Sequence, residues 1–184
     1  MPPDLSDAVL LLVDLQKSID HPSWGSRNNR DAEARTAELL DHWRATGRPV
    51  WHIRHDSTDP ASHYRPGQAG NEFKPEVAPL ADEIVIAKRT NSAFIGTDLE
   101  RRLRTGNHTR LIVVGVSTSN SVEATVRMAG NLGFETYLVE DCCFTFAKKD
   151  WQGVDRSAEE VQAMSLANLH GEYCTVIRSE TLLP

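Results

Sequence analysis

The sequence predicts an α/β fold, with a mostly parallel sheet covered by helices on both faces. Short apolar runs alternate with longer helical stretches along the whole chain, and neither a linker nor a repeat interrupts them. Glycine follows the first three helical stretches at Gly47, Gly106 and Gly133, where a helix is expected to stop. At 184 residues, the chain fits one domain spanning 1–184, with a sizeable core.

The apolar runs are rich in β-branched residues and short enough to be buried strands. Six strands are expected, at residues 8–14, 49–54, 83–88, 110–116, 135–140 and 173–178. Helices are expected between several of them, at residues 31–46, 97–105, 121–132 and 158–170. Connections of this kind join parallel strands and place helices on the faces of the sheet.

Three polar side chains stand where predicted strands end. Asp14 closes the first strand, Lys88 closes the third, and Ser121 lies in the Ser/Thr/Asn-rich turn after the fourth. The turn offers helix N-cap residues, and a helix N-terminus suits a nucleophile or a developing oxyanion. Because the ends of parallel strands converge on one crevice, we expect the three side chains to meet. The alternative is an ordinary strand-to-helix turn without chemistry.

The stretches around these residues resemble the isochorismatase-like, or cysteine hydrolase, superfamily, over residues 10–183. The resemblance implies a three-layer α/β/α, Rossmann-like fold with six strands in the order 3-2-1-4-5-6. It also implies a small-molecule substrate, a homo-oligomer (dimer or tetramer) and no cofactor. The residues that carry it are Asp14-Leu15-Gln16, Lys88 through Ser92-Ala93-Phe94, Gly96-Thr97-Asp98-Leu99, and Gly115-Val116 followed by Thr118.

The same resemblance implies an activity and a set of site residues. Asp14 and Lys88 correspond to a catalytic aspartate and lysine, and the catalytic cysteine falls at Ser121. The reaction is hydrolysis of a small amide, carbamoyl or ureido C–N bond through an acyl-enzyme. The backbone N–H groups of Ser117 and residue 121 would form the oxyanion hole, after a cis peptide that follows Val116. Substrate-binding residues are expected at Gln16 and Asn120. Independently of the resemblance, Trp24 and Phe94 lie near the two motif loops and are candidates to flank a substrate, with packing as the alternative.

Serine at position 121 departs from the family pattern. A hydroxyl is far less acidic than a thiol, and this site has no histidine base built to activate it. A deliberate Cys→Ser change would preserve the geometry and remove turnover, and the intact flanking residues favour it. A natural serine variant would be slow or retuned. An isochorismatase-type enzyme would instead protonate a vinyl ether through Asp14, and a non-catalytic, ligand-binding member remains an alternative.

Composition excludes several classes of function. The net charge of -6 and pI near 5.6 argue against a nucleic-acid partner, which requires a basic surface. The longest apolar run, residues 8–13, is too short to span a bilayer, and the N-terminus does not read as a secretion signal. Three cysteines without metal spacing fit a reducing compartment, so a cytoplasmic location is expected.

A metal site is not expected. Nicotinamidases of the family carry an aspartate, a histidine two residues on, and a further histidine. Here Asp56 is followed at that spacing by Thr58, which breaks the pattern. His52 and His55 are three apart on a probable strand end, where alternation sends them to opposite faces, and His63 alone does not complete a site.

Cys142 and Cys143 follow a strand, so a thiol there is an alternative nucleophile. No helix begins at either residue, which favours a packing role, and Cys174 lies in an apolar strand where it is read as core.

Residues 55–79 form the least regular stretch of the chain. A loop of that length in a compact domain is more often functional than idle, so we interpret it as a pocket wall or lid. A surface excursion or a contact with a neighbouring subunit is the alternative.

Overall fold

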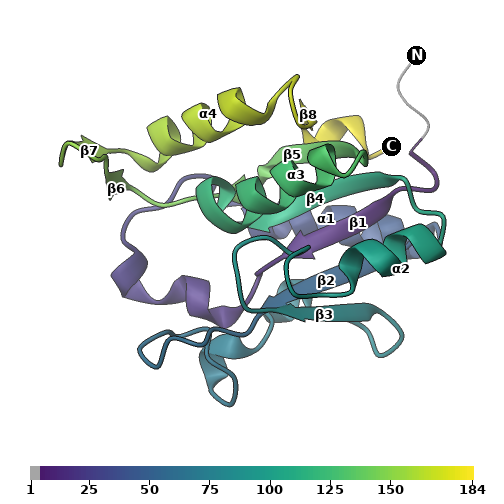
Figure 1. The fold of residues 1–184 in the computed structure, drawn as a ribbon, viewed down its shortest axis with the longest axis horizontal. Coiled ribbons are helices and arrows are strands. Elements are labelled where there is room, and N and C mark those ends of the chain that lie inside the picture. The colour runs from purple at the N-terminus through teal and green to yellow at the C-terminus, as the bar shows by residue number, and fades with distance from the viewer. Residues whose placement is uncertain (1–4) are drawn as a thin grey trace.

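The computed structural model describes residues 5–184 (Figure 1). Six strands form one sheet in the order β3-β2-β1-β4-β5-β8, with every neighbouring pair parallel. The predicted order is therefore confirmed, with β8 as the sixth strand. The strands are β1 (Val9–Val13), β2 (Val50–His55), β3 (Ile84–Lys88), β4 (Arg110–Val116), β5 (Glu135–Phe144) and β8 (Thr175–Ile177).

Helices cover both faces of the sheet, as predicted. The helix α1 (Ala32–Ala45) lies on one face, and α2 (Leu99–Thr105), α3 (Glu123–Asn131) and α4 (Ala158–Leu169) lie on the other (Figure 1). The buried strand β1 serves both layers, because Leu10 and Leu12 pack into the core beside α1 while Val9, Leu11 and Val13 pack into the opposite core. Short 3₁₀ turns occur at Lys17–Asp20, Pro22–Trp24, Ala69–Asn71, Pro75–Val77 and Ser179–Thr181.

Two predicted boundaries near the carboxyl edge of the sheet were wrong. The fifth strand continues to Phe144 instead of ending at residue 140, because a register shift between Val113 and Gly115 lets β4 and β5 pair again further along. The third helix does not begin at Ser121: a π-helical turn, Thr118–Val122, precedes α3, and no side chain caps it. Ser121 thus lies inside this turn.

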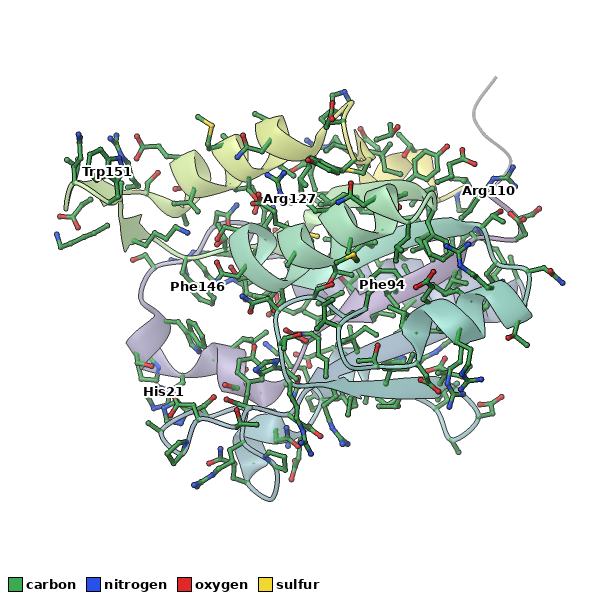
Figure 2. All side chains as sticks on the ribbon, viewed as in Figure 1. His21, Phe94, Arg110, Arg127, Phe146 and Trp151 are labelled. Atoms are coloured by element: carbon green, nitrogen blue, oxygen red, sulfur yellow. The ribbon has the colours of Figure 1, made fainter. Side chains whose placement is uncertain are left out.

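The structure contains a hairpin that the sequence did not predict. Strands β6 (Lys148–Lys149) and β7 (Asp155–Arg156) pair only with each other, and charged, exposed residues of this kind carry no apolar alternation to indicate strands. Figure 2 shows Trp151 at the tip of this hairpin, directed away from the sheet, and the residue is 91% exposed. Within residues 5–184, no helix combines the length and apolar character needed to cross a membrane.

Gly115 allows β4 to lie close to β1 where both strands reach the crevice. It has φ +131°, and a Cβ added there would lie 2.1 Å from the carbonyl oxygen of Val13, its partner in the ladder. Only glycine combines this backbone angle with so close an approach. The chain can therefore pass from a buried strand straight into the turn that carries Ser121.

Candidate active site

Asp14, Lys88 and Ser121 meet at the carboxyl edge of the sheet. The ammonium Nζ of Lys88 lies 2.7 Å from Oδ2 of Asp14 and 3.2 Å from Oγ of Ser121. Lys88 is 1% exposed, Asp14 3% and Ser121 7%. The strand order separates β3 from β1 by one strand, so the lysine side chain reaches past the end of β2 to contact the aspartate. The convergence expected from the strand ends is thus present in the geometry.

The backbone of Asp14 turns sharply out of β1. Its φ is +54°, a left-handed conformation that aspartate tolerates better than most residues. The turn is held on both sides, since the N–H of Asp14 donates to the carbonyl of Ile53 at 3.0 Å and its own carbonyl accepts from the N–H of Gln16 at 2.8 Å. The carboxylate is therefore directed by main-chain contacts into the crevice.

The turn after β4 holds Ser121 through its own backbone. The peptide bond between Val116 and Ser117 is cis. The carbonyl of Ser117 accepts hydrogen bonds from the N–H groups of Asn120 at 3.0 Å and Val122 at 3.2 Å. The hydroxyl of Thr118 donates to Oε1 of Gln162 on α4 at 2.8 Å, so helix α4 braces the turn from outside.

Burial controls the electrostatics of the site. Burial raises the pKa of the Asp14 carboxyl above its ordinary value, and the adjacent Lys88 ammonium opposes that rise without cancelling it. Among residues 5–184, Oδ1 of Asp14 is buried and has no hydrogen-bond partner, whereas Oδ2 is bonded to Lys88. The carboxyl group therefore has one oxygen anchored and one available to a proton or a bound molecule.

A cavity of about 140 Å³ opens beside these residues. Aromatic rings form much of its wall: Trp24 stacks on Phe146 with ring centroids 5.3 Å apart, and its edge faces Tyr64 at 6.3 Å. Residues 55–79, which were interpreted as a pocket wall or lid, supply part of the wall through His55, Ser62 and Tyr64. The lining residues are Asp14, Trp24, His55, Ser62, Tyr64, Asn91, Val116, Ser117, Asn120, Ser121 and Phe146.

Two expected substrate-binding residues, Gln16 and Phe94, lie elsewhere. Gln16 is fully buried, and its side chain bonds to the backbone of His55 and Asn71 instead of facing the cavity. Phe94 packs against Phe134 in the core, with ring centroids 5.8 Å apart. Figure 2 places Phe94 near α2 and α3, away from Phe146. Both residues were expected at the site because they lie in the motifs next to Asp14 and Lys88. Their side chains point into the interior of the protein instead.

His55, Tyr64 and Phe146 are cavity residues that the sequence analysis did not name as individual site residues. His55 ends β2 and is the ladder partner of Lys88, so it lies beside the predicted catalytic lysine. The rule that located Lys88 could have found it, because both residues close parallel strands. Tyr64 lies in the 55–79 stretch that was interpreted as a pocket wall. Phe146 follows β5 by two residues, but the strand was predicted to end at residue 140, too early to indicate it.

The described residues do not provide a metal site. Within 5–184, no group of three or more His, Cys, Asp and Glu side chains is placed to hold an ion. Asp56 is bonded to Arg54 at 2.8 Å and to Asn71 at 3.0 Å, and His52 is bonded to Glu83 at 2.9 Å. These side chains are already engaged with other partners.

The cysteines lie in the core. Cys142 and Cys143 are fully buried, and neither lines the cavity. Burial raises the thiol pKa of Cys142 and of Cys174 to about 12, and that of Cys143 well above its ordinary value. A thiol that resists ionisation is a poor nucleophile, so the packing interpretation holds for all three.

Comparison with known proteins places the chain in one family. The family model described as the isochorismatase domain matches residues 8–181. A crystal structure of an isochorismatase-family protein from Chromobacterium violaceum is 61% identical and superposes with a TM-score of 0.96, covering 99% of this chain and 95% of its own. The uncharacterised isochorismatase-family protein YrdC of Bacillus subtilis is 38% identical, over 95% of this chain and 93% of YrdC.

Two more distant relatives carry an activity in their names. Nicotinamidase 3 of Arabidopsis thaliana is 28% identical over 78% of this chain and 76% of its own length. The maleamate amidohydrolase of Pseudomonas putida is 36% identical over 38% of this chain and 33% of its own length. The resemblance seen in the sequence motifs is thus confirmed across nearly the whole length: the chain belongs to the isochorismatase family of hydrolases.

Proposed function

We propose that this chain has the architecture of a small-molecule amidase, cleaving an amide, carbamoyl or ureido C–N bond with residue 121 as the nucleophile. One observation carries the proposal: a single buried ammonium, that of Lys88, contacts both the Asp14 carboxylate and the Ser121 hydroxyl beside a cavity. A nucleophile, a proton acceptor and a cation in mutual contact are the parts that acyl transfer needs. Amide-cleaving relatives support the same reaction class.

The mechanism is most simply written for a cysteine at position 121. Asp14 takes the thiol proton, and Lys88 stabilises the thiolate. Sulfur then bonds to the carbonyl carbon, and the carbonyl oxygen becomes an oxyanion that the N–H groups of Ser117 and residue 121 receive. The C–N bond breaks as the proton held by Asp14 passes to the leaving nitrogen.

Water completes the cycle. It bonds to the acyl carbon while Asp14 takes one of its protons, the C–S bond breaks, and the proton returns to sulfur as the carboxylic acid leaves. The unpartnered Oδ1 of Asp14 is the oxygen free to carry these protons, because Oδ2 stays bonded to Lys88. The raised pKa of this carboxyl favours its service as an acid as well as a base.

The serine form retains every group except the sulfur. Its hydroxyl proton is much harder to remove than that of a thiol, and among the described residues no imidazole is hydrogen-bonded to Ser121. We therefore propose that the present form is inactive or turns over far more slowly than a cysteine form.

A vinyl ether hydrolase is the second candidate, because protonation by Asp14 would need no thiol and the raised pKa of Asp14 suits an acid. Its substrate, isochorismate, is multiply anionic and would require cationic side chains in the cavity. Arg54, Arg65 and Arg89 are the candidate cations that the sequence offers for such a substrate. They are not among the cavity-lining residues, and Arg54 is engaged with Asp56. This favours the amidase.

A non-catalytic binding protein is the third candidate. It does not account for the buried Asp14–Lys88 pair, since apolar residues could replace a buried ion pair that has no chemical role.

The test is a paired assay of this protein and its Ser121→Cys form against maleamate, nicotinamide, N-carbamoylsarcosine and ureido compounds, following ammonia release. Ser119→Cys, which places a thiol two residues away in the same turn, is the matched control. Activity that appears with Ser121→Cys and not with Ser119→Cys supports the thiol mechanism. Pyruvate release from isochorismate by the serine form would support the ether reaction, and tight binding without turnover in either form would support the binding protein.

A further inference from the structure

Lys88 has more acceptors around it than it has protons to donate. Its Nζ lies 2.7 Å from Asp14 Oδ2, 3.1 Å from the carbonyl oxygen of Thr90, 3.2 Å from Ser121 Oγ and 3.2 Å from Nδ1 of His55. An ammonium has three N–H groups and accepts nothing. The nitrogen of His55 that faces it can therefore only accept, and the proton of the neutral imidazole is assigned to the other nitrogen, Nε2.

The neutral state of His55 has independent support. Burial and the charge of Lys88 lower the pKa of the imidazole below its ordinary value. At neutral pH the ring therefore carries one proton. Burial and Lys88 together thus keep His55 neutral, and the contact with Lys88 sets its tautomer.

The ring of His55 is directed toward the cavity. It packs edge-on against Tyr64, with centroids 5.4 Å apart and planes at 90°. His55 lines the cavity together with Asp14 and Ser121, and within residues 5–184 its Nε2 has no hydrogen-bond partner. The imidazole thus contributes an unused N–H donor at the site of the proposed chemistry.

Gln16 clamps the backbone of His55. The Nε2 of Gln16 donates to the carbonyl of His55 at 3.1 Å, and the N–H of His55 donates to Oε1 of Gln16 at 2.7 Å. The backbone pairing of β1 with β2 ends at Val13 and Ile53. Just beyond this point, the side-chain amide of Gln16 makes the two hydrogen bonds to His55 that a neighbouring strand would otherwise make. Asn71 adds a further bond to the same carbonyl at 3.0 Å.

We propose that His55 is a substrate-binding residue, donating a hydrogen bond from Nε2 to a carbonyl or carboxylate oxygen of the substrate, and that Gln16 is the residue that positions it. This inference rests on the proposed function, because it adds a second anchor to the cavity in which the C–N bond would be cleaved. The small cavity, of about 140 Å³, favours a compact amide, and the Nε2–H donor of His55 favours one that carries an oxygen acceptor beside its scissile bond.

Substituting His55 with asparagine or with glutamine distinguishes the roles of its two ring nitrogens. In a Ser121→Cys background, His55→Asn keeps an acceptor near the Nδ1 position and loses the Nε2 donor, whereas His55→Gln reaches the Nε2 position with an amide N–H. We expect His55→Asn to raise KM roughly tenfold, as loss of a buried hydrogen bond implies, with a smaller change in kcat. His55→Gln should recover part of the affinity.

Gln16→Glu tests the positioning role. It keeps the acceptor for the His55 N–H and loses the donor to the His55 carbonyl. We expect a KM increase in the same direction as that of His55→Asn, without further loss in the Gln16→Glu/His55→Asn double variant. If Gln16→Glu lowers kcat at an unchanged KM, or if the effects of Gln16→Glu and His55→Asn on KM are additive in the double variant, then Gln16 does not position His55 and only supports the fold.

Ligand binding can be measured in the serine protein without any catalysis, so this inference can be tested separately from the proposed function. Two-bond ¹H–¹⁵N correlation spectra of the serine protein should report the Nε2–H tautomer of His55, and titration with maleamate should shift the Nε2–H resonance. If Ser121→Cys is active but His55→Asn leaves KM unchanged for every substrate, the inference fails and the proposed function stands. If Ser121→Cys is inactive, the proposed function fails, and the titration decides whether His55 binds ligand. An Nδ1–H tautomer, or no shift with any panel compound, overturns the inference.

Discussion

Lys88 donates a hydrogen bond of 2.7 Å to Asp14. Counting side-chain atoms alone, Lys88 is 0% exposed and Asp14 is 5% exposed. Charges buried to this degree lose their hydration, and their mutual attraction offsets that loss without a large net gain. The pair therefore contributes less to folding than its geometry suggests. Its main effect is to keep a cation and a carboxylate in contact with the same cavity.

Breaking this pair on one side should destabilise the protein more than removing it entirely. Lys88→Met leaves the Asp14 carboxyl buried without its partner and is expected to cost about 3–5 kcal/mol of unfolding free energy. The double variant Asp14→Asn/Lys88→Met should be more stable than Lys88→Met alone, because asparagine carries no charge and tolerates the positive φ at position 14. Urea unfolding of the three proteins measures this, and additive losses would contradict it.

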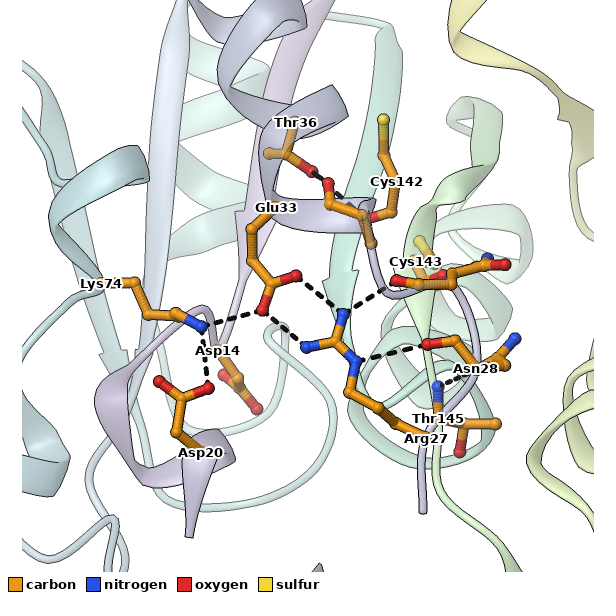
Figure 3. A network of polar contacts seen from close by, with 12 residues as sticks. Asp14, Asp20, Arg27, Asn28, Glu33, Thr36, Lys74, Cys142, Cys143 and Thr145 are labelled. Atoms are coloured by element: carbon orange, nitrogen blue, oxygen red, sulfur yellow. Dashed lines mark hydrogen bonds and ion pairs between the residues drawn. The ribbon is translucent and has the colours of Figure 1, made fainter.

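A second buried ion cluster links the loop before α1 to the helix itself. Figure 3 shows Arg27 and Lys74 both directed at Glu33, and the structure gives two bonds of 2.7 Å from Arg27 and one of 2.9 Å from Lys74. Lys74 also bonds Asp20 at 2.8 Å. Burial raises the pKa of Glu33, but the bonds from Arg27 and Lys74 outweigh it and bring the pKa to about 2.

This cluster predicts a specific loss of stability in acid. A carboxyl whose folded pKa lies below its unfolded value stabilises the fold above the unfolded pKa, and loses that contribution as the pH falls through the folded value. For Glu33 the window runs from the ordinary 4.5 down to about 2, and the contribution is up to about 3 kcal/mol. Glu33→Gln should therefore flatten the fall in unfolding free energy across this window.

The control for that experiment is Glu38→Gln, which removes an exposed carboxylate from the same helix, one that makes no ion pair with the described residues. Unfolding in urea at several pH values between 2 and 6 should give parallel curves for this variant and the unchanged protein. An equal flattening in both variants would mean that the cluster is not the source of the acid sensitivity.

Gly115 is expected to be irreplaceable. Gly115→Ala would place a methyl group 2.1 Å from the Val13 carbonyl oxygen, so β4 must move away from β1 beside the site, and a loss of at least about 3 kcal/mol is expected. Gly133→Ala is the matched control, because its φ of +83° imposes backbone strain while nothing lies within 4 Å of the added carbon. Thermal unfolding of the two variants compares them, and equal losses would mean that backbone strain alone accounts for Gly115.

The positions of the strands and the meeting of Asp14 with Lys88 could be predicted because both depend on local patterns: buried apolar runs and polar residues at their ends. The order of the strands in the sheet came instead from the resemblance to the family. The strand-end rule could have located His55 at the site, but the contact of its ring with Lys88 depends on the register His55↔Lys88, which no local pattern in a single chain encodes. Gln16 was taken for a substrate contact for a related reason. The sequence shows that Gln16 follows Asp14 closely. The direction of its amide toward His55 depends on the backbone turn at Asp14, which the sequence does not show.

Gln162 on α4 joins three segments around the nucleophile turn. Only 4% exposed, it accepts from the Thr118 hydroxyl at 2.8 Å and donates from Nε2 to the carbonyls of Glu140 at 3.0 Å and Cys143 at 3.3 Å. The amide thus ties the turn that carries Ser121 to the end of β5. Gln162→Leu leaves the buried Thr118 hydroxyl without this partner, while the carbonyls of Glu140 and Cys143 keep a bond from Asn29. The change should cost about 1–3 kcal/mol.

A double-mutant cycle with Thr118→Val isolates the bond to the turn. If the Thr118–Gln162 contact holds the nucleophile in place, Gln162→Leu and Thr118→Val should each lower kcat in the Ser121→Cys form, and the double variant should lose no more than the larger single loss. Gln152→Leu, at the exposed hairpin, controls for the loss of a glutamine. Losses in kcat that add up would mean that the two residues act independently and that α4 does not position the nucleophile through this bond.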